Sequence, residues 1–242
     1  MLKRAGAGLP AYRRTAVPPV VALSALLGAV SLVPNPAFGQ ASHRTLTIGR
    51  LHYDGGGDWY ANPSSLTNLL EEVGRRTSLR VTDREQVVTI TSPELWDMPY
   101  IYMTGHGNVL FSDEEVLILR RYLENGGFLH ADDNYGMDES FRREIARVFP
   151  DHPLVEVPLD HPIYSVVYEM PQGIPKIHEH DGKPAQGFGI FVDDRLAVFY
   201  SYQTDLGDGW EDEGVHDDPP DIRELAFQMG VNLYVFSVVA GR

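Results

Sequence analysis

The stretch from Tyr100 to Asp133, YIYMTGHGNVLFSDEEVLILRRYLENGGFLHADD, decides the fold class. It opens with an apolar and aromatic run that leads into the loop TGHG, which is typical of a buried strand followed by a glycine turn. Ser112 and Glu115 have the spacing of a capping box, and Gly126-Gly127 is a typical helix end. The run FLHADD predicts a second strand. A strand, a helix and a strand in this order predict parallel strands covered by helices.

The sequence before this stretch repeats the same alternation. Thr45–Tyr53 has the apolar and β-branched density of a strand and leads into the loop DGGGDWY. Asn62 is a suitable N-cap and Pro63 suits the first turn, so an amphipathic helix is predicted to follow them. Leu79–Thr82 predicts a short second strand.

The sequence after it first continues and then changes the pattern. A helix with apolar residues at helical spacing is predicted to end at Pro150. FGIFVDDRLAVFYS then predicts a β-hairpin that turns at Asp193-Asp194, and a core-packed helix is predicted from about Pro220. The fold class expected is a three-layer α/β sandwich with a mostly parallel sheet, a C-terminal β-hairpin and a C-terminal helix.

Residues 1–39 have the features of a cleaved export signal. Their start is basic with no acid, Val20–Val33 is apolar or small, and breakers and small residues precede Gly39. That stretch is short of the roughly 20 residues that span a bilayer, so we expect cleavage after Gly39, with Ala41 as the alternative, and no stable membrane insertion afterwards. Residues 40–242 would then form a single α/β domain in the periplasm or outside the cell. The pair Arg13-Arg14 leaves a twin-arginine route open beside the general one.

Composition narrows the classes of partner and chemistry. Residues 1–39 hold four of the 20 Lys and Arg residues and none of the 34 Asp and Glu residues, so the mature chain would carry 16 basic and 34 acidic residues, a formal charge of −18. Such a surface repels phosphate backbones, so we expect neither nucleic acid nor anionic membrane as a partner. The chain has no cysteine, which excludes disulfides, a thiol nucleophile and thiolate metal ligands.

Chemistry-bearing residues gather where the predicted strands end. Parallel α/β sheets bind ligands beyond the carboxyl ends of their strands, between the first and third strands in the flavodoxin-like order. We therefore expect His106, Asp132 and Asp133 to be catalytic residues at one hollow. The residues expected to bind a ligand there are His52, Asp54, Asp58, Trp59, Thr104, Gly105, His130, Asn134, Asp205 and Trp210.

The adjacent carboxylates of Asp132 and Asp133 have three interpretations. One of them could cap the following turn. Together they could act as an acid and a base, because two close carboxylates disfavour double ionisation. With Asp54 and a histidine they could bind a hard divalent cation. Residue spacing does not choose among the three, and neighbouring residues of a strand point to opposite faces.

Four further features bear on the ligand. The loop DGGGDWY lacks the Lys and Ser/Thr of a phosphate-binding loop, so we do not expect a nucleotide there. The segment His178–Asp181, HEHD, could place two histidines on one face as metal ligands, or it could be an exposed loop. The acidic segment Asp205–Gly214 is expected to be a solvated loop, with calcium as an alternative. The aromatic residues that could form a wall for stacking a sugar are Trp59, Tyr60, Tyr202 and Trp210.

The stretch from Ser92 to Asp133 makes a family resemblance specific. The sequence resembles the bacterial family of domain of unknown function 4159 over nearly all of the mature chain, and that family resembles the class I glutamine amidotransferase-like group. The resemblance implies a flavodoxin-like α/β sandwich. Active amidotransferases carry a cysteine at a tight strand-to-helix elbow, where this chain has HADDNYG, so amidotransferase activity is not expected.

Two functions are compatible with these residues. The first is an exported domain that binds a small polar ligand or a glycan at the carboxyl edge of the sheet. The second is a hydrolase that uses an Asp/His pair, with or without a divalent metal, on a cell-envelope or carbohydrate substrate. No cofactor is firmly implied. Binding is favoured, because no complete set of nucleophile, base and orienting group can be traced.

Overall fold

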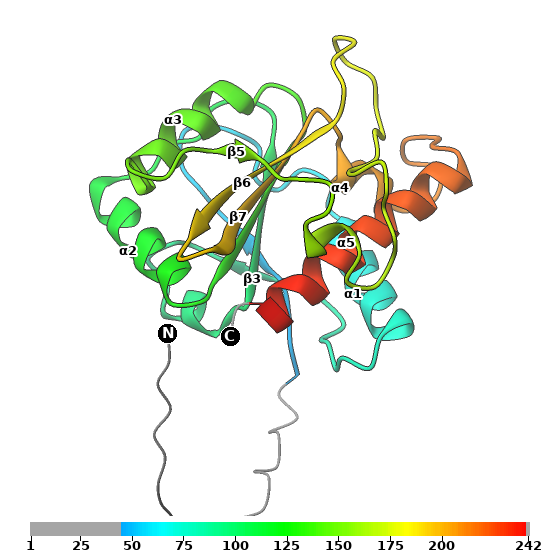
Figure 1. Ribbon diagram of the computed structural model, residues 1–242, viewed down its shortest axis with the longest axis horizontal. Helices are drawn as coiled ribbons and strands as arrows, with labels where there is room; N and C mark the ends of the chain where they lie inside the picture. The colour runs from blue at the N-terminus through cyan, green and yellow to red at the C-terminus, as the bar shows by residue number, and fades with distance from the viewer. Residues whose placement is uncertain (1–44, 241–242) are drawn as a thin grey trace, which may run out of the picture. The chain divides into compact units, whose positions relative to one another are not determined.

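One seven-stranded sheet runs through the described part of the chain, residues 45–240 of a computed structural model (Figure 1). The predicted export signal lies outside the described residues. The strands are β1 (Gly49–Leu51), β2 (Gln86–Val88), β3 (Tyr100–Gly105), β4 (Phe128–Asp133), β5 (Val155–Glu156), β6 (Gln186–Val192) and β7 (Arg195–Tyr202). Their order is β2-β1-β3-β4-β7-β6-β5, and β1 to β4 and β7 are parallel. The parallel part therefore has the flavodoxin-like order, with β7 as its fifth strand.

Helices cover both faces of this sheet, as predicted. They are α1 (Ser65–Arg76), α2 (Asp113–Glu124), α3 (Asp138–Val148), the short α4 (Leu206–Gly209) and α5 (Pro220–Ala240), with 3₁₀ turns η1 (Pro93–Asp97) and η2 (Pro162–Tyr164). In Figure 1, α2 and α3 lie on one side of the sheet and α1 and α5 on the other. Strand alternation explains the two cores: Ile101 and Met103 of β3 pack in the core with α2 and α3, whereas Tyr100 and Tyr102 pack in the core with α1 and α5. The three-layer sandwich is confirmed.

The capping box predicted for α2 is formed. The Ser112 side chain accepts a hydrogen bond from the Glu115 N–H, and the Glu115 carboxylate accepts one from the Ser112 N–H. At the other end Gly126 has φ 98°, and the Gly127 N–H donates to the Tyr122 carbonyl. These bonds satisfy backbone groups that a helix leaves free at its ends.

The C-terminal hairpin and helix are also confirmed. Asp193 and Asp194 both have positive φ, 49° and 63°, which is the backbone of a type I′ hairpin turn. The turn pairs β6 with β7 so that Ile190 lies opposite Val198, and β5 adds to the outer edge of β6. Among the described residues, no helix is both long enough and apolar enough to cross a membrane.

Two local predictions were wrong. Asn62 does not cap α1: its side chain donates to Asp208, and the Ser64 and Ser65 N–H groups bind the distant Glu211 carboxylate instead. The second strand is β2, not the segment Leu79–Thr82, from which Val81 makes only one bridge, to Leu46. Between Thr82 and β2 the chain forms a bulge. The Thr82 N–H donates to the Leu46 carbonyl and the Gln86 N–H donates to the Ile48 carbonyl, so more residues lie on this segment than on the partner segment opposite it.

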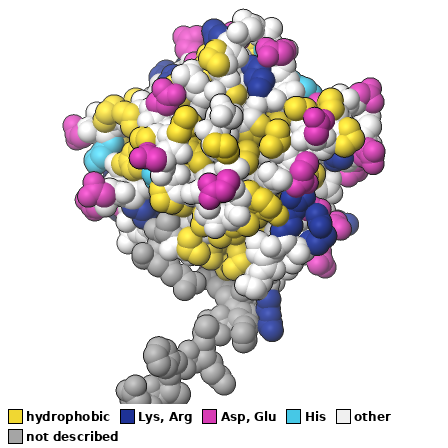
Figure 2. Space-filling model, turned by 45° about the vertical axis from the view of Figure 1, so that its right-hand side comes forward, with side chains coloured by type: hydrophobic (Ala, Val, Ile, Leu, Met, Phe, Trp, Pro, Cys, Tyr) yellow, Lys and Arg dark blue, Asp and Glu magenta, His cyan; other side chains and the backbone are white. Residues whose placement is uncertain are grey.

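Acidic side chains are dispersed over the face shown in Figure 2. They stand among hydrophobic and uncharged side chains and form no continuous acidic field in that view. Dispersed carboxylates of this kind are well solvated, so on this face they increase solubility and do not form one binding surface.

The capping box gives a first test of the fold. Replacing Ser112 with alanine removes the acceptor for the Glu115 N–H, so the free energy of unfolding should fall by about 1 kcal/mol in a urea titration. Ser112→Thr keeps the hydroxyl and should lose clearly less. Equal losses in the two variants would show that the hydroxyl does not stabilise α2.

Candidate functional site

Four adjacent strands, β1, β3, β4 and β7, end at one edge of the sheet, which is called the carboxyl edge below. Gly105 at the end of β3 is paired with Asp133 at the end of β4, and Asp132 is paired with Ser201 of β7. The loops after these strands therefore start at the same level. The edge carries two groups of ionisable side chains, the Asp58–His106 pair beyond β1 and β3 and an aspartate–histidine cluster beyond β4 and β7.

The Asp58–His106 pair joins the loop after β1 to the loop after β3. His106 Nδ1 lies 2.9 Å from Asp58 Oδ2, and the His106 N–H donates to Asp58 Oδ1. Gly105 permits this approach: it has φ 143°, and a Cβ there would lie 2.4 Å from the Tyr53 hydroxyl and 3.0 Å from Asp58 Oδ1. Sequence analysis placed both partners of the pair at one hollow, and the structure brings them into contact.

Electrostatics fix the orientation of the His106 ring. Burial alone would raise the pKa of Asp58, but the hydrogen bonds from His106 outweigh it and the pKa is lowered. Asp58 is therefore a carboxylate, which only accepts hydrogen bonds, so Nδ1 carries the proton. Nε2 is then the free nitrogen, on a side chain that is 57% exposed. In its neutral form an imidazole held in this way offers a hydrogen-bond acceptor, or a base, to a ligand.

The glycine loop after β1 is fastened beside this pair. The Leu110 N–H donates to the Asp54 carbonyl, and the Gly57 N–H donates to the Asn108 carbonyl. Trp59 stacks on His52 with ring centroids 4.2 Å apart. The loop thus places the half-buried rings of His52 and Trp59 next to Asp58, while the Asp54 side chain is exposed.

Asp132 lies beneath the edge, fully buried. Its Oδ1 accepts hydrogen bonds from the Ser201 hydroxyl at 2.5 Å and the Leu206 N–H at 3.3 Å. Its Oδ2 accepts from the Tyr102 hydroxyl at 2.9 Å and the Gly207 N–H at 2.7 Å. Burial raises the pKa of Asp132 to about 6, and these hydrogen bonds limit the rise. Both oxygens are occupied by the protein, so the carboxylate holds α4 on the sheet.

Asp133, the next residue, has the opposite environment. It is buried, and neither carboxylate oxygen has a partner in good hydrogen-bond geometry among the described residues. Burial and then the charge of Asp138 raise its pKa, while the nearby Gln203 and Met137 N–H groups and the Tyr200 hydroxyl limit the rise. Strand alternation turns it away from Asp132, so the predicted pair does not share a proton directly. The following Asn134 is also buried, at 3% exposure.

An aspartate–histidine cluster forms beyond β4 and β7. The segment before His178 is laid along the end of β7, because the Ile177 N–H donates to the Thr204 carbonyl and the Thr204 hydroxyl to Pro175. This brings histidines from one loop onto aspartates of the turn that starts α4. The members of the cluster are His178, His180, Asp205, Asp208, His216 and Asp218.

Contacts within the cluster are short and involve buried carboxylates. His178 Nδ1 lies 2.8 Å from Asp208 Oδ2 and 4.0 Å from Asp205 Oδ2, and His180 Nε2 contacts Asp205 Oδ2. Asp205 is a non-glycine residue with φ 59°, a conformation seen mostly where the surroundings impose it. Burial and then the charges of Asp132, Asp208 and Asp133 raise the pKa of Asp205 to about 9. The acidic segment predicted as a solvated loop is thus partly buried.

Three predicted ligand-binding residues do not reach the edge, because all three are fully buried. The Thr104 hydroxyl donates to the Asp132 carbonyl. His130 is hydrogen-bonded to Tyr100 and Ser201, and burial lowers its pKa to about 3, so it is neutral. Trp210 donates through Nε1 to the Ala226 carbonyl of α5. The proposed sugar-stacking wall therefore lacks Trp210, whose ring belongs to the core.

A family model described as "Domain of unknown function (DUF4159)" matches residues 47–238. The chain belongs to this family. No curated protein matches the chain. The family resemblance noted in the sequence is thus confirmed, while the further likeness to the amidotransferase-like group stays a prediction. Since the family description names no activity, the function has to be argued from the carboxyl edge.

Sequence analysis missed part of the cluster in this DUF4159 chain. Asp208 belongs to the segment Asp205–Gly214 that was predicted to be a solvated loop, and nothing was predicted for His216 and Asp218. The pair His178 and His180 was left open between metal ligands and an exposed loop. The signal available was a histidine on each side of a hairpin, each within an acidic segment. Only the fold shows that these segments meet, because the contacting residues are 25 to 40 positions apart and two strands lie between them.

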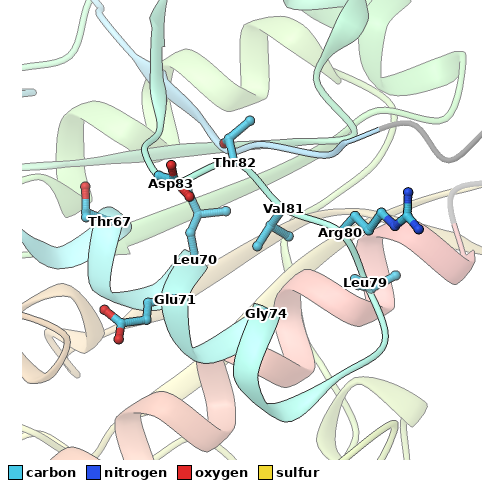
Figure 3. A pocket seen from close by; sticks show the side chains of 9 residues that line it. All are labelled: Thr67, Leu70, Glu71, Gly74, Leu79, Arg80, Val81, Thr82 and Asp83. Carbon is cyan, nitrogen blue, oxygen red and sulfur yellow. The ribbon is translucent and has the colours of Figure 1, made fainter.

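A groove of 490 Å³ lies elsewhere, between α1 and the segment before β2 (Figure 3). Leu70, Leu79 and Val81 give it apolar side chains, and Glu71, Arg80 and Asp83 give it charged ones. None of the predicted site residues lines it. We therefore place the candidate site at the carboxyl edge.

The two adjacent aspartates should respond oppositely to the same substitution. In Asp132→Asn the side-chain NH₂ group takes the place of one carboxylate oxygen. In either orientation of the amide it faces a backbone N–H, of Leu206 or of Gly207, that has lost its acceptor. The free energy of unfolding at about pH 7.5 should therefore fall by about 2 kcal/mol. Asp133→Asn removes a buried charge whose desolvation is not offset by the weak contacts around it, so it should stabilise by about 1 kcal/mol.

The pH dependence of stability tests whether the charge of Asp133 is the cause of its predicted effect. Because the pKa of Asp133 is raised in the folded protein, its ionisation lowers stability as the pH rises above the ordinary aspartate range. The advantage of Asp133→Asn should therefore be absent near pH 3.5 and grow towards about pH 7.5 in urea titrations. An advantage that is equal at both pH values would contradict this account of Asp133.

Proposed function

We propose that this protein is an exported domain that binds a small polar ligand, of the glycan class, at the carboxyl edge of its sheet. The observation that carries the proposal is the Asp58–His106 pair, which leaves His106 Nε2 free on a half-exposed ring. The pair stands between β1 and β3, where parallel sheets of this order bind ligands. The resemblance to the amidotransferase-like group supports the same edge by analogy of fold alone.

The surroundings of the pair favour recognition of hydroxyl groups. His106 Nε2 accepts from a ligand hydroxyl. The exposed Tyr60 ring, edge-on to Trp59 at 5.6 Å, offers an apolar face on the loop that carries Asp58. Asp54 and Asn108 are exposed on the same two loops and supply further polar groups. An acidic protein with these groups suits a neutral ligand better than an anionic one.

Binding is favoured over nucleophilic catalysis. Thr104, the hydroxyl that the sequence offered beside His106, is buried and donates to Asp132, so it does not serve as a nucleophile. The second candidate function is hydrolysis, in which His106 acts as a general base on water and Asp58 orients it. The same Asp58–His106 contact favours that candidate, because a base needs a partner that fixes its tautomer.

Ligand binding is tested with the disaccharide of β-1,4-linked N-acetylglucosamine and saturation-transfer NMR. The wild type should give a saturation-transfer signal, His106→Ala should lose it, and Asp58→Asn should weaken binding by about tenfold, a loss of ~1.4 kcal/mol. His152→Ala, which changes an exposed histidine after α3, is the matched control and should bind normally. A full signal from His106→Ala would rule out the pair as the contact.

Chromogenic substrates distinguish the two candidates. A binding protein should release no nitrophenol from the p-nitrophenyl glycoside of N-acetylglucosamine above the rate of the buffer. Release that falls by about 100-fold in His106→Ala would establish the hydrolase instead.

Export rests on the basic start and the apolar stretch of residues 1–39. Expression of the full chain in a Gram-negative host should deliver a protein whose N-terminus, determined by mass spectrometry of the periplasmic fraction, is Gln40 or Ser42. An intact N-terminus on a protein retained in the cytoplasm would contradict export.

A further inference from the structure

We infer that His178, Asp208 and His216 form a binding site for a divalent first-row transition metal, of which Zn²⁺ is the test ion. The site is separate from the Asp58–His106 pair, and the inference does not depend on the proposed function. Each of the three residues offers one ligand atom, and these atoms lie within 4.8 Å of one another.

The spacing suits a metal ion. Two ligands of a tetrahedral Zn²⁺, each about 2.0–2.1 Å from the ion, are roughly 3.3 Å apart. His178 Nδ1 lies 2.8 Å and His216 Nδ1 3.8 Å from Asp208 Oδ2, so the observed separations bracket that value. Two imidazoles and one carboxylate are a common donor set for zinc and other first-row metals, and they leave coordination positions open to a ligand or water.

The two contacts of the His178 ring favour a bound cation. Its Nδ1 lies 2.8 Å from Asp208 and its Nε2 lies 2.8 Å from Asp218, so both ring nitrogens face carboxylates, which only accept. A neutral imidazole has one N–H and satisfies one of these contacts. The other contact needs a second proton or a metal ion at the nitrogen. A metal at Nδ1 leaves the Nε2–H to donate to Asp218, which is the usual arrangement of a metal-bound histidine and its carboxylate partner.

The supporting residues are built around this arrangement. Asn62 donates from Nδ2 to Asp208 Oδ1 at 2.7 Å, which leaves Oδ2 turned to the histidines. Asn62 is itself held with φ 54°, and the buried Arg50 donates to its carbonyl at 3.0 Å. Such second contacts fix the orientation of metal ligands. Asn62 lies in the loop after β1 and Arg50 lies in β1, so the sheet sets the orientation of the Asp208 side chain.

Buried carboxylate oxygens without hydrogen-bond partners are an independent observation in favour of a bound cation. Asp205 Oδ1 and Asp218 Oδ2 have no hydrogen-bond partner among the described residues, and the two side chains are 0% and 6% exposed. Each of these carboxylates faces His178 through its other oxygen, Asp205 Oδ2 at 4.0 Å from Nδ1 and Asp218 Oδ1 at 2.8 Å from Nε2. Buried polar atoms are almost always hydrogen-bonded, so two unpaired oxygens in the residues around this ring require an explanation. A divalent cation supplies positive charge beside the Asp208 carboxylate and, through His178, faces the Asp218 carboxylate.

Metal analysis of the purified full chain tests the inference. After dialysis against Zn²⁺ and then buffer, the wild type should retain one ion per chain, and Zn²⁺ should raise its melting temperature, which EDTA should reverse. Asp218→Asn should lower the Zn²⁺ affinity by about tenfold, and His178→Ala and His216→Ala should lower it further. His152→Ala is the matched control and should bind Zn²⁺ as the wild type does.

A second measurement needs no variant. In the ¹⁵N-labelled wild type, Zn²⁺ should shift the Nδ1 resonances of two histidines, assigned as His178 and His216, and leave those of the exposed His152 in place. Retention of the ion by the His178→Ala/His216→Ala double variant, or a wild type without a stoichiometric ion and without shifted histidines, would overturn the metal site. Neither readout involves a sugar, so failure here is distinguishable from failure of the proposed function.

Discussion

The buried carboxylate of Asp132 is the interaction on which the carboxyl edge depends. It accepts hydrogen bonds from Tyr102 of β3, from Ser201 of β7 and from two N–H groups at the start of α4. A buried carboxylate is stable only when its oxygens are hydrogen-bonded, and here backbone and side-chain donors share that task. The turn that carries Asp205 and Asp208 is thereby fixed on the ends of two strands. Neither aspartate would hold its place without this anchor.

Close packing makes the anchor specific. A Cβ at Gly207 would lie 2.4 Å from the Tyr102 hydroxyl and 3.2 Å from Asp132 Oδ2, so only glycine lets the turn sit this low on the sheet. The same turn faces the loop after β1 through the contact of Asn62 with Asp208. The positions of the acidic groups therefore follow from backbone geometry and not from the charges themselves, which repel one another.

Local signals predicted the layers of the fold but not the partners across the edge. Hydrophobic periodicity, the capping box at Ser112 and the turn at Asp193-Asp194 depend on residues within a few positions of one another, so the sequence reveals them directly. The true cap of α1 is Glu211, 146 or more residues away. Asn62 has the side chain of an N-cap, but the distant Asp208 takes its hydrogen bond. Competition of this kind is invisible until the topology is known.

In the site, too, residues that follow predicted strands could be placed from the sequence, whereas contacts between distant segments could not. The order of parallel strands placed Asp58 and His106 around one hollow, because both follow strands that flank the switch point, but it did not predict their direct contact. It also placed Asp132 at the edge, but burial of Tyr102 and Ser201 around it makes Asp132 a structural group. The sequence offered His178 and His180 as possible metal ligands, but it did not show which aspartates they meet, since that depends on how the irregular segment before β6 folds back onto β7.

The Asp58–His106 pair and the aspartate–histidine cluster are supported by the same loops. The loop after β1 carries Asp58 at one end and Asn62, which orients Asp208, at the other. The loop after β4 makes a second link, since Tyr135 stacks on His180 at 4.6 Å while Gly136 approaches Gly107, the neighbour of His106. The same two loops therefore contact both His106 and the aspartate–histidine cluster. Two chemically separate groups thus share one supporting frame, which is the arrangement expected when a sheet edge positions several loops at once.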